Sequence, residues 1–291
     1  PIRELADKFN TLQMGMVGAE RVFKVLDTDD TTENTGTYAP AKMEGSIQFE
    51  NVWFAYNDDN FVLKDLTFDV KGGQTIALVG ATGAGKSSTI NILNRFYDIK
   101  SGQIKIDGVL IQDYELNYLR NKIATVLQDV FLFSDTIYNN ITLNNPEITM
   151  DRVVDAAKKV GAHDFIQRLP GQYNYNVMER GATLSAGQAQ LISFIRALVY
   201  DPSILVLDEA TSSVDTESEL MIQSAIEKLM EGRTSVVIAH RLSTIQKADK
   251  IIVLEKGEIM EIGTHQQLLK KNGYYKTLYD LQFSSEGIAM D

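Results

Sequence analysis

The sequence predicts an α/β domain with a mostly parallel sheet, for three reasons. Two continuous apolar runs, "ILVLD" at 204–208 and "TSVVI" at 234–238, are typical of parallel strands that are buried on both faces. A third run, "TIALVG" at 75–80, leads through a glycine-rich turn directly into a helical pattern. Strands and helices alternate along much of the chain, and this alternation is the pattern of α/β folds.

Composition limits the class of protein. The 291 residues carry a net charge of −11, which weighs against a nucleic-acid binder because such proteins neutralise phosphates with Lys and Arg. The absence of cysteine excludes disulfides, thiol catalysis and zinc–thiolate sites. No apolar run approaches the roughly 18 residues of a membrane helix. The first residue is Pro rather than Met, so we expect a piece of a longer chain.

Residues 1–26 are predicted to form a helix with a narrow apolar seam. Its apolar residues recur at alternating intervals of four and three, at Leu5, Phe9, Leu12, Met16, Ala19, Phe23 and Leu26. Such a seam cannot form a core alone, so the helix must pack on its own domain or on an absent one. Residues 27–45 break the periodicity and are rich in Thr and Asp, which predicts an exposed linker.

From residue 46 the elements of a compact domain follow in order. "SIQFENVWFAY" alternates apolar and polar residues, and "LTFDV" and "QTIALVG" indicate two more strands. A helix is expected from about Lys86 to Phe96, then a hairpin over 102–111 with Asp107-Gly108 as its turn, and a short strand at "IATVLQ". Helix and loop dominate at about 129–198, and "KIIVLEKGEIMEIG" forms a final hairpin.

The strongest chemical signal is "GATGAGKSS" at 80–88, which fits the phosphate-binding pattern G-x-x-x-x-G-K-[ST]. Glycines let the backbone N–H groups approach phosphate, the lysine reaches the β- and γ-phosphates, and the serine after it binds Mg²⁺. A plain glycine-rich turn would not need a strand before it and a helix after it. The predicted nucleotide contacts of this loop are Gly80, Thr82, Gly83, Ala84, Gly85, Lys86, Ser87 and Ser88.

A second signal ends the strand at 204–208. Asp208 and Glu209 stand at its carboxyl end, where open α/β sheets bind ligands. Many strands end in acids, so this signal is weak alone and gains weight beside the phosphate loop. Asp208 is expected to hold Mg²⁺ through water, and Glu209 to polarise an attacking water molecule.

Four motifs together resemble the ABC-type ATPases over residues 46 to about 283: the phosphate loop, "TLSAGQAQ" at 183–190, "LVLDEATSSVD" at 205–215 and "VVIAHRLST" at 236–244. "VLQDVFLFSDTIYNNI" and "MERGATLSAGQ" are most similar to segments of the nucleotide-binding domains of ABC exporters. The resemblance implies a P-loop NTPase core with an antiparallel β subdomain and an inserted α-helical subdomain at about 129–198. Residues 284–291 would be a tail.

The resemblance also implies roles for single residues. Tyr56 matches the aromatic residue that stacks on adenine, and Gln128 the glutamine that bonds Mg²⁺ or the attacking water. Glu209 is then the general base for hydrolysis of ATP, and His240 contacts the γ-phosphate. Ser213 and Asp215 lie in a segment that communicates across a dimer. His163 and His265 have no such context, and we expect structural roles for them.

Further expectations concern partners. In the family two such domains dimerise head to tail, so Ser185, Gly187 and Gln188 would cap the ATP that is held by the partner's phosphate loop. Ala186 departs from the usual Gly of this signature and is tolerated if its backbone is helical. The chain would act at the cytoplasmic face of the cell membrane with a transmembrane domain, and residues 1–26 resemble the cytoplasmic end of the last transmembrane helix. Homodimer and heterodimer, and the transported substrate, stay open.

Two alternatives share the nucleotide motifs. A soluble ABC ATPase acting on nucleic acid or the ribosome is disfavoured by the acidic balance, by the lack of a long coiled-coil insertion and by the exporter-like first helix. A nucleotide-gated regulatory domain without turnover is expected to lack Glu209 or His240, and both are present. The sequence therefore predicts an ATPase that powers export.

Overall fold

The computed structural model describes residues 1–28, 32, 34–57, 60–208, 216–239 and 242–283. The chain divides into two compact units, residues 1–33 and residues 34–291. We describe each unit by itself.

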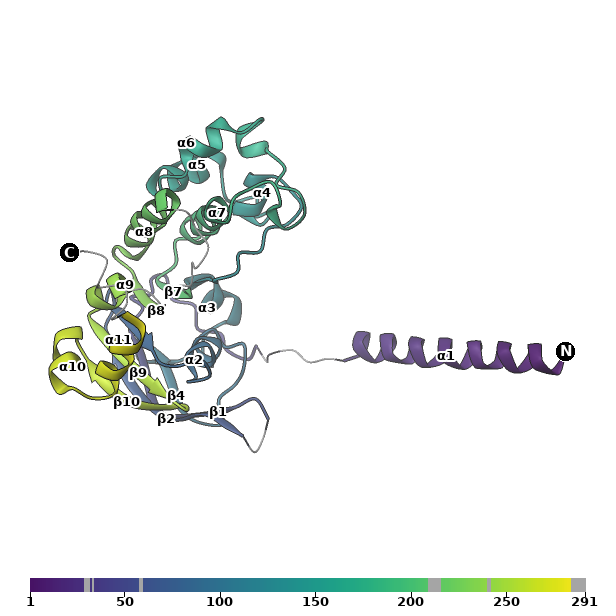
Figure 1. The fold of residues 1–291 in the computed structure, drawn as a ribbon, viewed down its shortest axis with the longest axis horizontal. Coiled ribbons are helices and arrows are strands. Elements are labelled where there is room, and N and C mark those ends of the chain that lie inside the picture. Colours follow the sequence, from purple (N-terminus) through teal and green to yellow (C-terminus); the bar gives the residue numbers. More distant parts are fainter. Residues whose placement is uncertain (29–31, 33, 58–59, 209–215, 240–241, 284–291) are drawn as a thin grey trace. The chain divides into compact units, whose positions relative to one another are not determined.

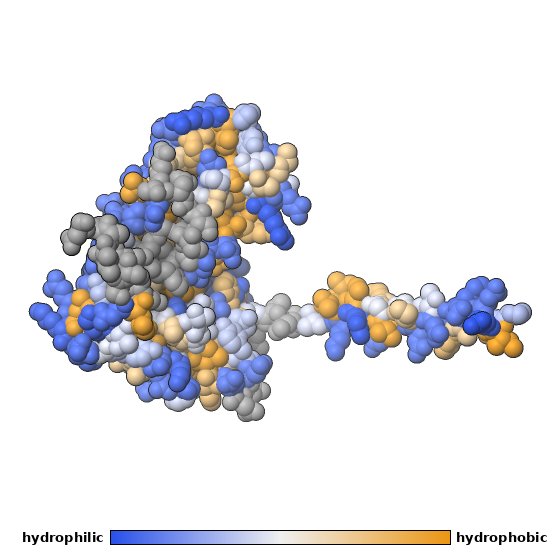
Figure 2. All heavy atoms as spheres, viewed as in Figure 1, coloured by the Kyte–Doolittle hydropathy of each residue, from blue (hydrophilic) through white to orange (hydrophobic). Residues whose placement is uncertain are grey.

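The first unit contains a single long helix, α1 (Ile2–Leu26), as its heptad pattern predicts. Every residue of α1 is exposed, including the apolar seam, and hydrophobic and hydrophilic residues both lie along its surface (Figure 2). Glu4 in the first turn and Lys24 in the last turn complement the helix dipole. Within the described residues, no helix combines the length and the apolar character that crossing a bilayer requires.

A six-stranded sheet forms the centre of the second unit (Figure 1). Five neighbouring strands are parallel, and β10 pairs antiparallel to β9 at one edge. In spatial order the strands are β10 (Glu258–Gly263), β9 (Lys250–Glu255), β3 (Thr75–Val79), β8 (Thr234–Ile238), β7 (Ile204–Asp208) and β6 (Ile123–Val126). The predicted parallel sheet and final hairpin are confirmed.

The continuous apolar runs have a direct physical cause, which β3 illustrates. Ile76 and Leu78 face one hydrophobic core, and Ala77 and Val79 face another on the opposite side of the sheet. Both faces of the strand are therefore buried, so its sequence from Ile76 to Val79 is apolar throughout and does not alternate between apolar and polar residues.

A four-stranded antiparallel sheet packs into the first core, as the predicted β subdomain requires. Its strands are, in spatial order, β2 (Phe61–Val70), β1 (Ile47–Ala55), β4 (Ser101–Ile106) and β5 (Val109–Leu110). The turn between β4 and β5 is the predicted one, with Asp107 at φ 50° and Gly108 at φ 78°. Positive φ at both positions is what a two-residue hairpin turn of this type demands.

Helices cover the other face of the large sheet and extend beyond it. Figure 1 shows α4 to α7 gathered together, away from the four-stranded sheet, in the part of the chain where the sequence predicts helix and loop. Their bounds are α4 (Ile137–Thr142), α5 (Met150–Lys159), α6 (His163–Arg168) and α7 (Ala186–Val199), with short 3₁₀ turns at Gln172–Asn174 and Glu179–Gly181. The C-terminal helices are α8 (Thr216–Met230), α9 (Leu242–Lys247), α10 (His265–Lys271) and α11 (Tyr274–Phe283).

Two helices differ from the prediction. The helix after the phosphate loop, α2 (Lys86–Leu93), stops short of Phe96. It ends because the side chain of Asn94 donates to the carbonyl of Ile90, and Arg95 then takes a left-handed backbone with φ 53°. Helix α3 (Leu116–Lys122) was not predicted, since seven residues give too little periodicity to detect.

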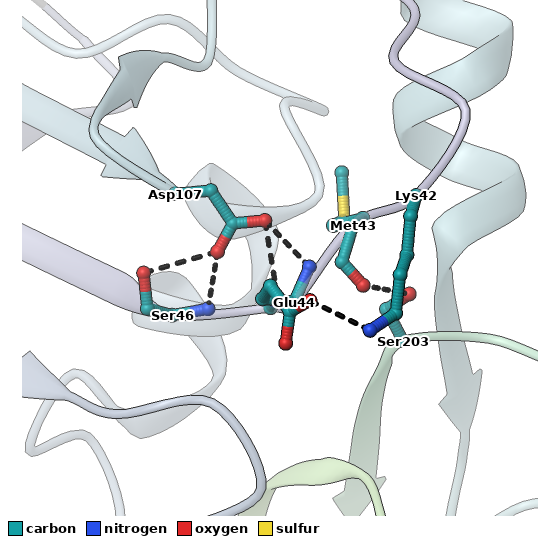
Figure 3. A network of polar contacts seen from close by, with 7 residues as sticks. Lys42, Met43, Glu44, Ser46, Asp107 and Ser203 are labelled. Atoms are coloured by element: carbon teal, nitrogen blue, oxygen red, sulfur yellow. Dashed lines mark hydrogen bonds and ion pairs between the residues drawn. The ribbon is translucent and has the colours of Figure 1, made fainter.

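Residues 34–46, at the start of the second unit, are hydrogen-bonded to the rest of that unit at several points. The clearest is the carboxylate of Asp107, which accepts from the backbone N–H groups of Glu44, Gly45 and Ser46 at 2.8, 3.2 and 2.8 Å (Figure 3). The hydroxyl of Ser46 donates to the same carboxylate at 3.0 Å. The β4–β5 turn thus fixes the chain immediately before β1.

Candidate active site

A pocket of about 330 Å³ opens at the carboxyl ends of the central strands. The phosphate loop follows β3, Asp208 ends β7, and Gln128 follows β6 by two residues. The lining residues are Val62, Thr82, Gly83, Gly85, Lys86, Ser87, Ser88, Gln128, Asp208 and Ile238. All but Val62 and Ile238 were predicted from the sequence, so segments that are far apart in the chain meet as expected at a ligand-binding edge of an open α/β sheet.

The phosphate loop has the backbone of an anion cradle. Gly83 and Gly85 have φ values of 81° and 106°, which L side chains rarely adopt. A Cβ atom on Gly83 would meet nothing within 4 Å, because that glycine faces the open pocket. Gly85 is the N-cap of α2 and offers no side-chain cap, so the first N–H groups of α2 are free to bind an anion.

The underside of the loop is seated on the β9–β10 hairpin. A Cβ atom on Gly80 would lie 2.2 Å from the carbonyl oxygen of Leu254, so only glycine allows this approach. Ala84 is buried, and its carbonyl accepts from the N–H of Gly257 at 3.0 Å. Gly80 and Ala84 therefore shape the loop from below and do not line the pocket.

Lys86 lies at the start of α2 with its amine turned back along the loop. The Nζ atom donates to the carbonyl oxygens of Gly80 at 2.6 Å and Ala81 at 3.1 Å. Partial burial lowers the pKa of Lys86 from its ordinary value, and the carboxylate of Asp208 acts in the opposite direction. The amine is thus held at the pocket by weak, neutral acceptors that an anionic phosphate can replace.

Ser87, Gln128 and Asp208 are among the oxygen-bearing side chains that line the pocket. Gln128 and Asp208 come together because β6 and β7 are parallel neighbours, with Val126, the last residue of β6, paired to Leu207, one residue before the end of β7. Ser87 lies in the first turn of α2. A hydroxyl, an amide and a carboxylate are the hard oxygen ligands that Mg²⁺ prefers. The donor set therefore fits a magnesium ion.

Tyr56 stands beside this pocket, just after β1. Its hydroxyl lies 3.1 Å from Oγ of Ser88, which is one of the lining residues. The side chain is 44% exposed, so the ring is accessible to a planar ligand. The predicted adenine platform and the phosphate loop are consequently neighbours in the structure.

The signature residues lie on a different element, at the start of α7. Ser185 is the N-cap: its Oγ accepts from the N–H of Gln188 at 3.2 Å, and Oε1 of Gln188 accepts from the N–H of Ser185 at 3.1 Å. This capping box leaves the N–H groups of Ala186 and Gly187 without intrahelical acceptors. Ala186 is inside the helix with no positive φ, so its Cβ is tolerated. None of these residues lines the pocket of the same chain.

Several predicted residues cannot be placed. Glu209, Ser213, Asp215 and His240 lie outside the described residues. The two histidines that were expected to be structural each pair with a tyrosine: Nδ1 of His163 lies 2.9 Å from the hydroxyl of Tyr173, and Nδ1 of His265 lies 2.7 Å from that of Tyr275. Burial lowers the pKa of His265 and raises that of Tyr173 to about 12.

Sequence reasoning missed three contributors to the site. Val62 and Ile238 line the pocket with apolar surface, and Gly257 supports the loop from the β9–β10 turn. A Cβ atom on Gly257 would lie 2.1 Å from the carbonyl oxygen of Val62, which explains glycine at this position. The available signal was the "KGE" turn of the predicted hairpin, but nothing local connects that turn to residue 84.

The family model described as ABC transporter matches residues 63–212, and the chain belongs to this family. The match extends from β2, through the phosphate loop and the signature, to the residues after β7. The P-loop α/β fold with its antiparallel and helical parts is therefore that of an ABC ATPase domain, as predicted.

Particular relatives are ABC transporter proteins of bacteria. The chain is 48% identical over 286 residues to the uncharacterized ABC transporter ATP-binding protein YknV of Bacillus subtilis, covering 98% of this chain and 47% of that protein. It is 46% identical to the ATP-dependent lipid A-core flippase of Alcanivorax borkumensis, covering 98% and 49%. The structure of a bacterial Atm1-family ABC exporter with ATP bound matches with a TM-score of 0.82 and 38% identity, covering 94% and 48%. The chain thus spans about half the length of the relatives it matches.

Proposed function

We propose that this chain is the ATP-binding and ATP-hydrolysing part of an ABC exporter. The observation that carries the proposal is the pocket itself: a glycine cradle, a lysine and three oxygen ligands converge at one edge of the sheet in a chain of the ABC transporter family. Residues 46–283 would be the ATPase domain, with its helical subdomain at about 129–198. Residues 27–45 would be the linker and 284–291 the tail.

The cradle supports a specific mode of phosphate binding. The N–H groups of the loop at Gly83 and of the first turn of α2 would donate to the phosphates, and the dipole of α2 would favour their charge. Lys86 exchanges the carbonyls of Gly80 and Ala81 for the β- and γ-phosphate oxygens. Tyr56 stacks on the adenine ring.

Ser87, Gln128 and Asp208 would hold the magnesium ion, Asp208 through water. When bound, Mg²⁺ neutralises charge that develops on the phosphate oxygens. Gln128 also orients the attacking water, Glu209 accepts its proton, and His240 contacts the γ-phosphate. These roles follow from the family resemblance and from the positions of Gln128 and Asp208 beside the loop.

A second copy or a related domain completes the site. Ser185, Gly187 and Gln188 do not line the pocket of their own chain, yet the start of α7 has N–H groups without intrahelical acceptors. We infer a head-to-tail dimer in which this helix start faces the γ-phosphate on the partner's loop. Closure and opening of that dimer would drive a transmembrane domain at the cytoplasmic face of the membrane. Residues 1–26 would continue from its last transmembrane helix, and the apolar seam of α1 would pack there.

The substitution Glu209→Gln tests the proposed hydrolysis. It should leave ATP binding intact and lower turnover by at least about 100-fold, the lower end of what general-base catalysis contributes. Steady-state phosphate release and calorimetric ATP binding are measured on the same protein. The matched control is Glu147→Gln, which neutralises an exposed carboxylate on the helical side. Parental turnover in Glu209→Gln would remove this residue from the role of base.

A further inference from the structure

The ring of Tyr56 is held from two sides by other aromatic rings. Phe54 contacts it edge-on with centroids 4.7 Å apart and planes at 79°, and Tyr97 does so at 4.9 Å and 89°. T-shaped contacts of this kind are the favoured geometry for aromatic pairs. We call Phe54, Tyr56 and Tyr97 the aromatic clamp. A ring that is 44% exposed is thereby kept in one orientation.

The hydroxyl of Tyr56 is anchored as well. Nδ2 of Asn91 donates to it at 3.1 Å, and Oγ of Ser88 lies 3.1 Å away on another side. Asn91 and Ser88 are both residues of α2, and the N-terminus of α2 forms part of the phosphate loop. The ring and the phosphate loop are therefore parts of one hydrogen-bonded unit.

The backbone turn that contains Tyr97 is itself held in place by α2 and α3. The carbonyl of Asn91 accepts from the N–H of Phe96 at 2.9 Å. Nη2 of Arg120, on α3, donates to the carbonyl of Arg95 at 2.9 Å, and its guanidinium lies 5.4 Å from the centroid of the Phe96 ring. Although Tyr97 is 47% exposed, its backbone is therefore braced from two helices.

We propose that Tyr97 and Asn91 are positioning residues for the nucleotide base: they hold the Tyr56 ring in its stacking orientation before ATP arrives. The inference rests on the proposed function, because it needs adenine to stack on Tyr56. Immobilising a free side chain on binding costs affinity, and a ring that is already fixed avoids this cost. Loss of either contact should weaken ATP binding by about two- to twelve-fold.

The test uses the full 291-residue chain and ATP as the probe, with the dissociation constant from calorimetry and kcat at saturating ATP. Tyr97→Leu and Asn91→Leu should each raise the dissociation constant by that factor and leave kcat unchanged. Tyr97→Phe retains the ring edge and should bind ATP as the parent does. Tyr38→Leu is the matched control, because Tyr38 is also exposed and makes a similar T-shaped contact at 5.1 Å, but with the ring of Tyr114 instead of that of Tyr56.

The possible failures are distinguishable. If the parental chain binds no ATP, the proposed function fails and the inference falls with it. If the parent binds ATP and both leucine variants bind it as tightly, the inference alone is overturned. It is also overturned if Tyr97→Phe is as weak as Tyr97→Leu, or if the loss appears in kcat with the dissociation constant unchanged.

Discussion

Alanine substitutions at three glycines separate the cost of folding the phosphate loop from its role in binding. Gly73, Gly83 and Gly85 have φ values of 78°, 81° and 106°. Any side chain is strained in such a backbone, by about 1–3 kcal/mol. Gly73 lies in the turn before β3, whereas Gly83 and Gly85 line the pocket.

The space around each glycine sets the rest of the effect. A Cβ atom on Gly73 or Gly83 would meet nothing within 4 Å, so only the backbone strain applies. A Cβ atom on Gly85 would lie 2.6 Å from Cδ2 of Leu63, whose side chain is fully buried and cannot turn away into solvent. Overpacking of this kind adds about 1–3 kcal/mol. We therefore expect losses of about 1–3 kcal/mol for Gly73→Ala and Gly83→Ala, and about 2–6 kcal/mol for Gly85→Ala.

Urea unfolding and calorimetric ATP binding would be measured for each variant. Gly73→Ala and Gly83→Ala should be destabilised alike, but only Gly83→Ala should lose ATP affinity, because its new methyl group occupies the phosphate pocket. ATP binding by Gly83→Ala at the level of Gly73→Ala would refute the assignment of the pocket. Equal stability of Gly83→Ala and Gly85→Ala would refute the packing argument.

The remaining predictions concern a structural carboxylate and the loop lysine. Asp107→Ala removes four hydrogen bonds and should lower the free energy of unfolding, measured in urea, by about 2–4 kcal/mol. Asp69→Ala, at an exposed carboxylate, is the control. A loss below about 0.5 kcal/mol in Asp107→Ala would contradict a stabilising role of these hydrogen bonds. Because burial lowers the pKa of Lys86 below 10.5, the free protein loses this proton before an ordinary lysine would, and ATP affinity should fall as the pH rises toward 10.5, by up to about tenfold per unit. Lys86→Arg keeps its charge and should show no such fall, whereas equal slopes in both proteins would exclude Lys86 as the cause.

The sequence predicts those parts of the fold and site whose signals are local. The Gly-Lys-Ser spacing of the loop, the double-sided apolar runs of β3, β7 and β8, and the Asp107-Gly108 turn each depend on a few adjacent residues. The meeting of Gln128 with Asp208 was also predictable, because strands of a parallel sheet end at one edge.

Contacts between distant segments could not be predicted. The N–H of Gly257 supports the loop through the carbonyl of Ala84, and the carboxylate of Asp107 holds the backbone at Glu44. Every residue type except proline has the same backbone N–H and carbonyl groups, so the sequence does not indicate which of these groups bond to each other. Lys86 is a similar case. The motif predicts that its amine binds phosphate, but it does not predict that, without ligand, the amine donates to the backbone carbonyl of Gly80.

The central claim is that the site is completed across two chains, and Ser185→Arg tests it most directly. Sedimentation of the full chain with a slowly hydrolysed ATP analogue would report dimerisation, and calorimetry at monomer concentrations would report binding. Ser185 is exposed at the start of α7 and does not line its own pocket, so the variant should bind the nucleotide normally and fail to dimerise. The control Ser101→Arg, at the exposed start of β4, should bind the nucleotide and dimerise as the parent does. Loss of nucleotide binding by monomeric Ser185→Arg would contradict the account.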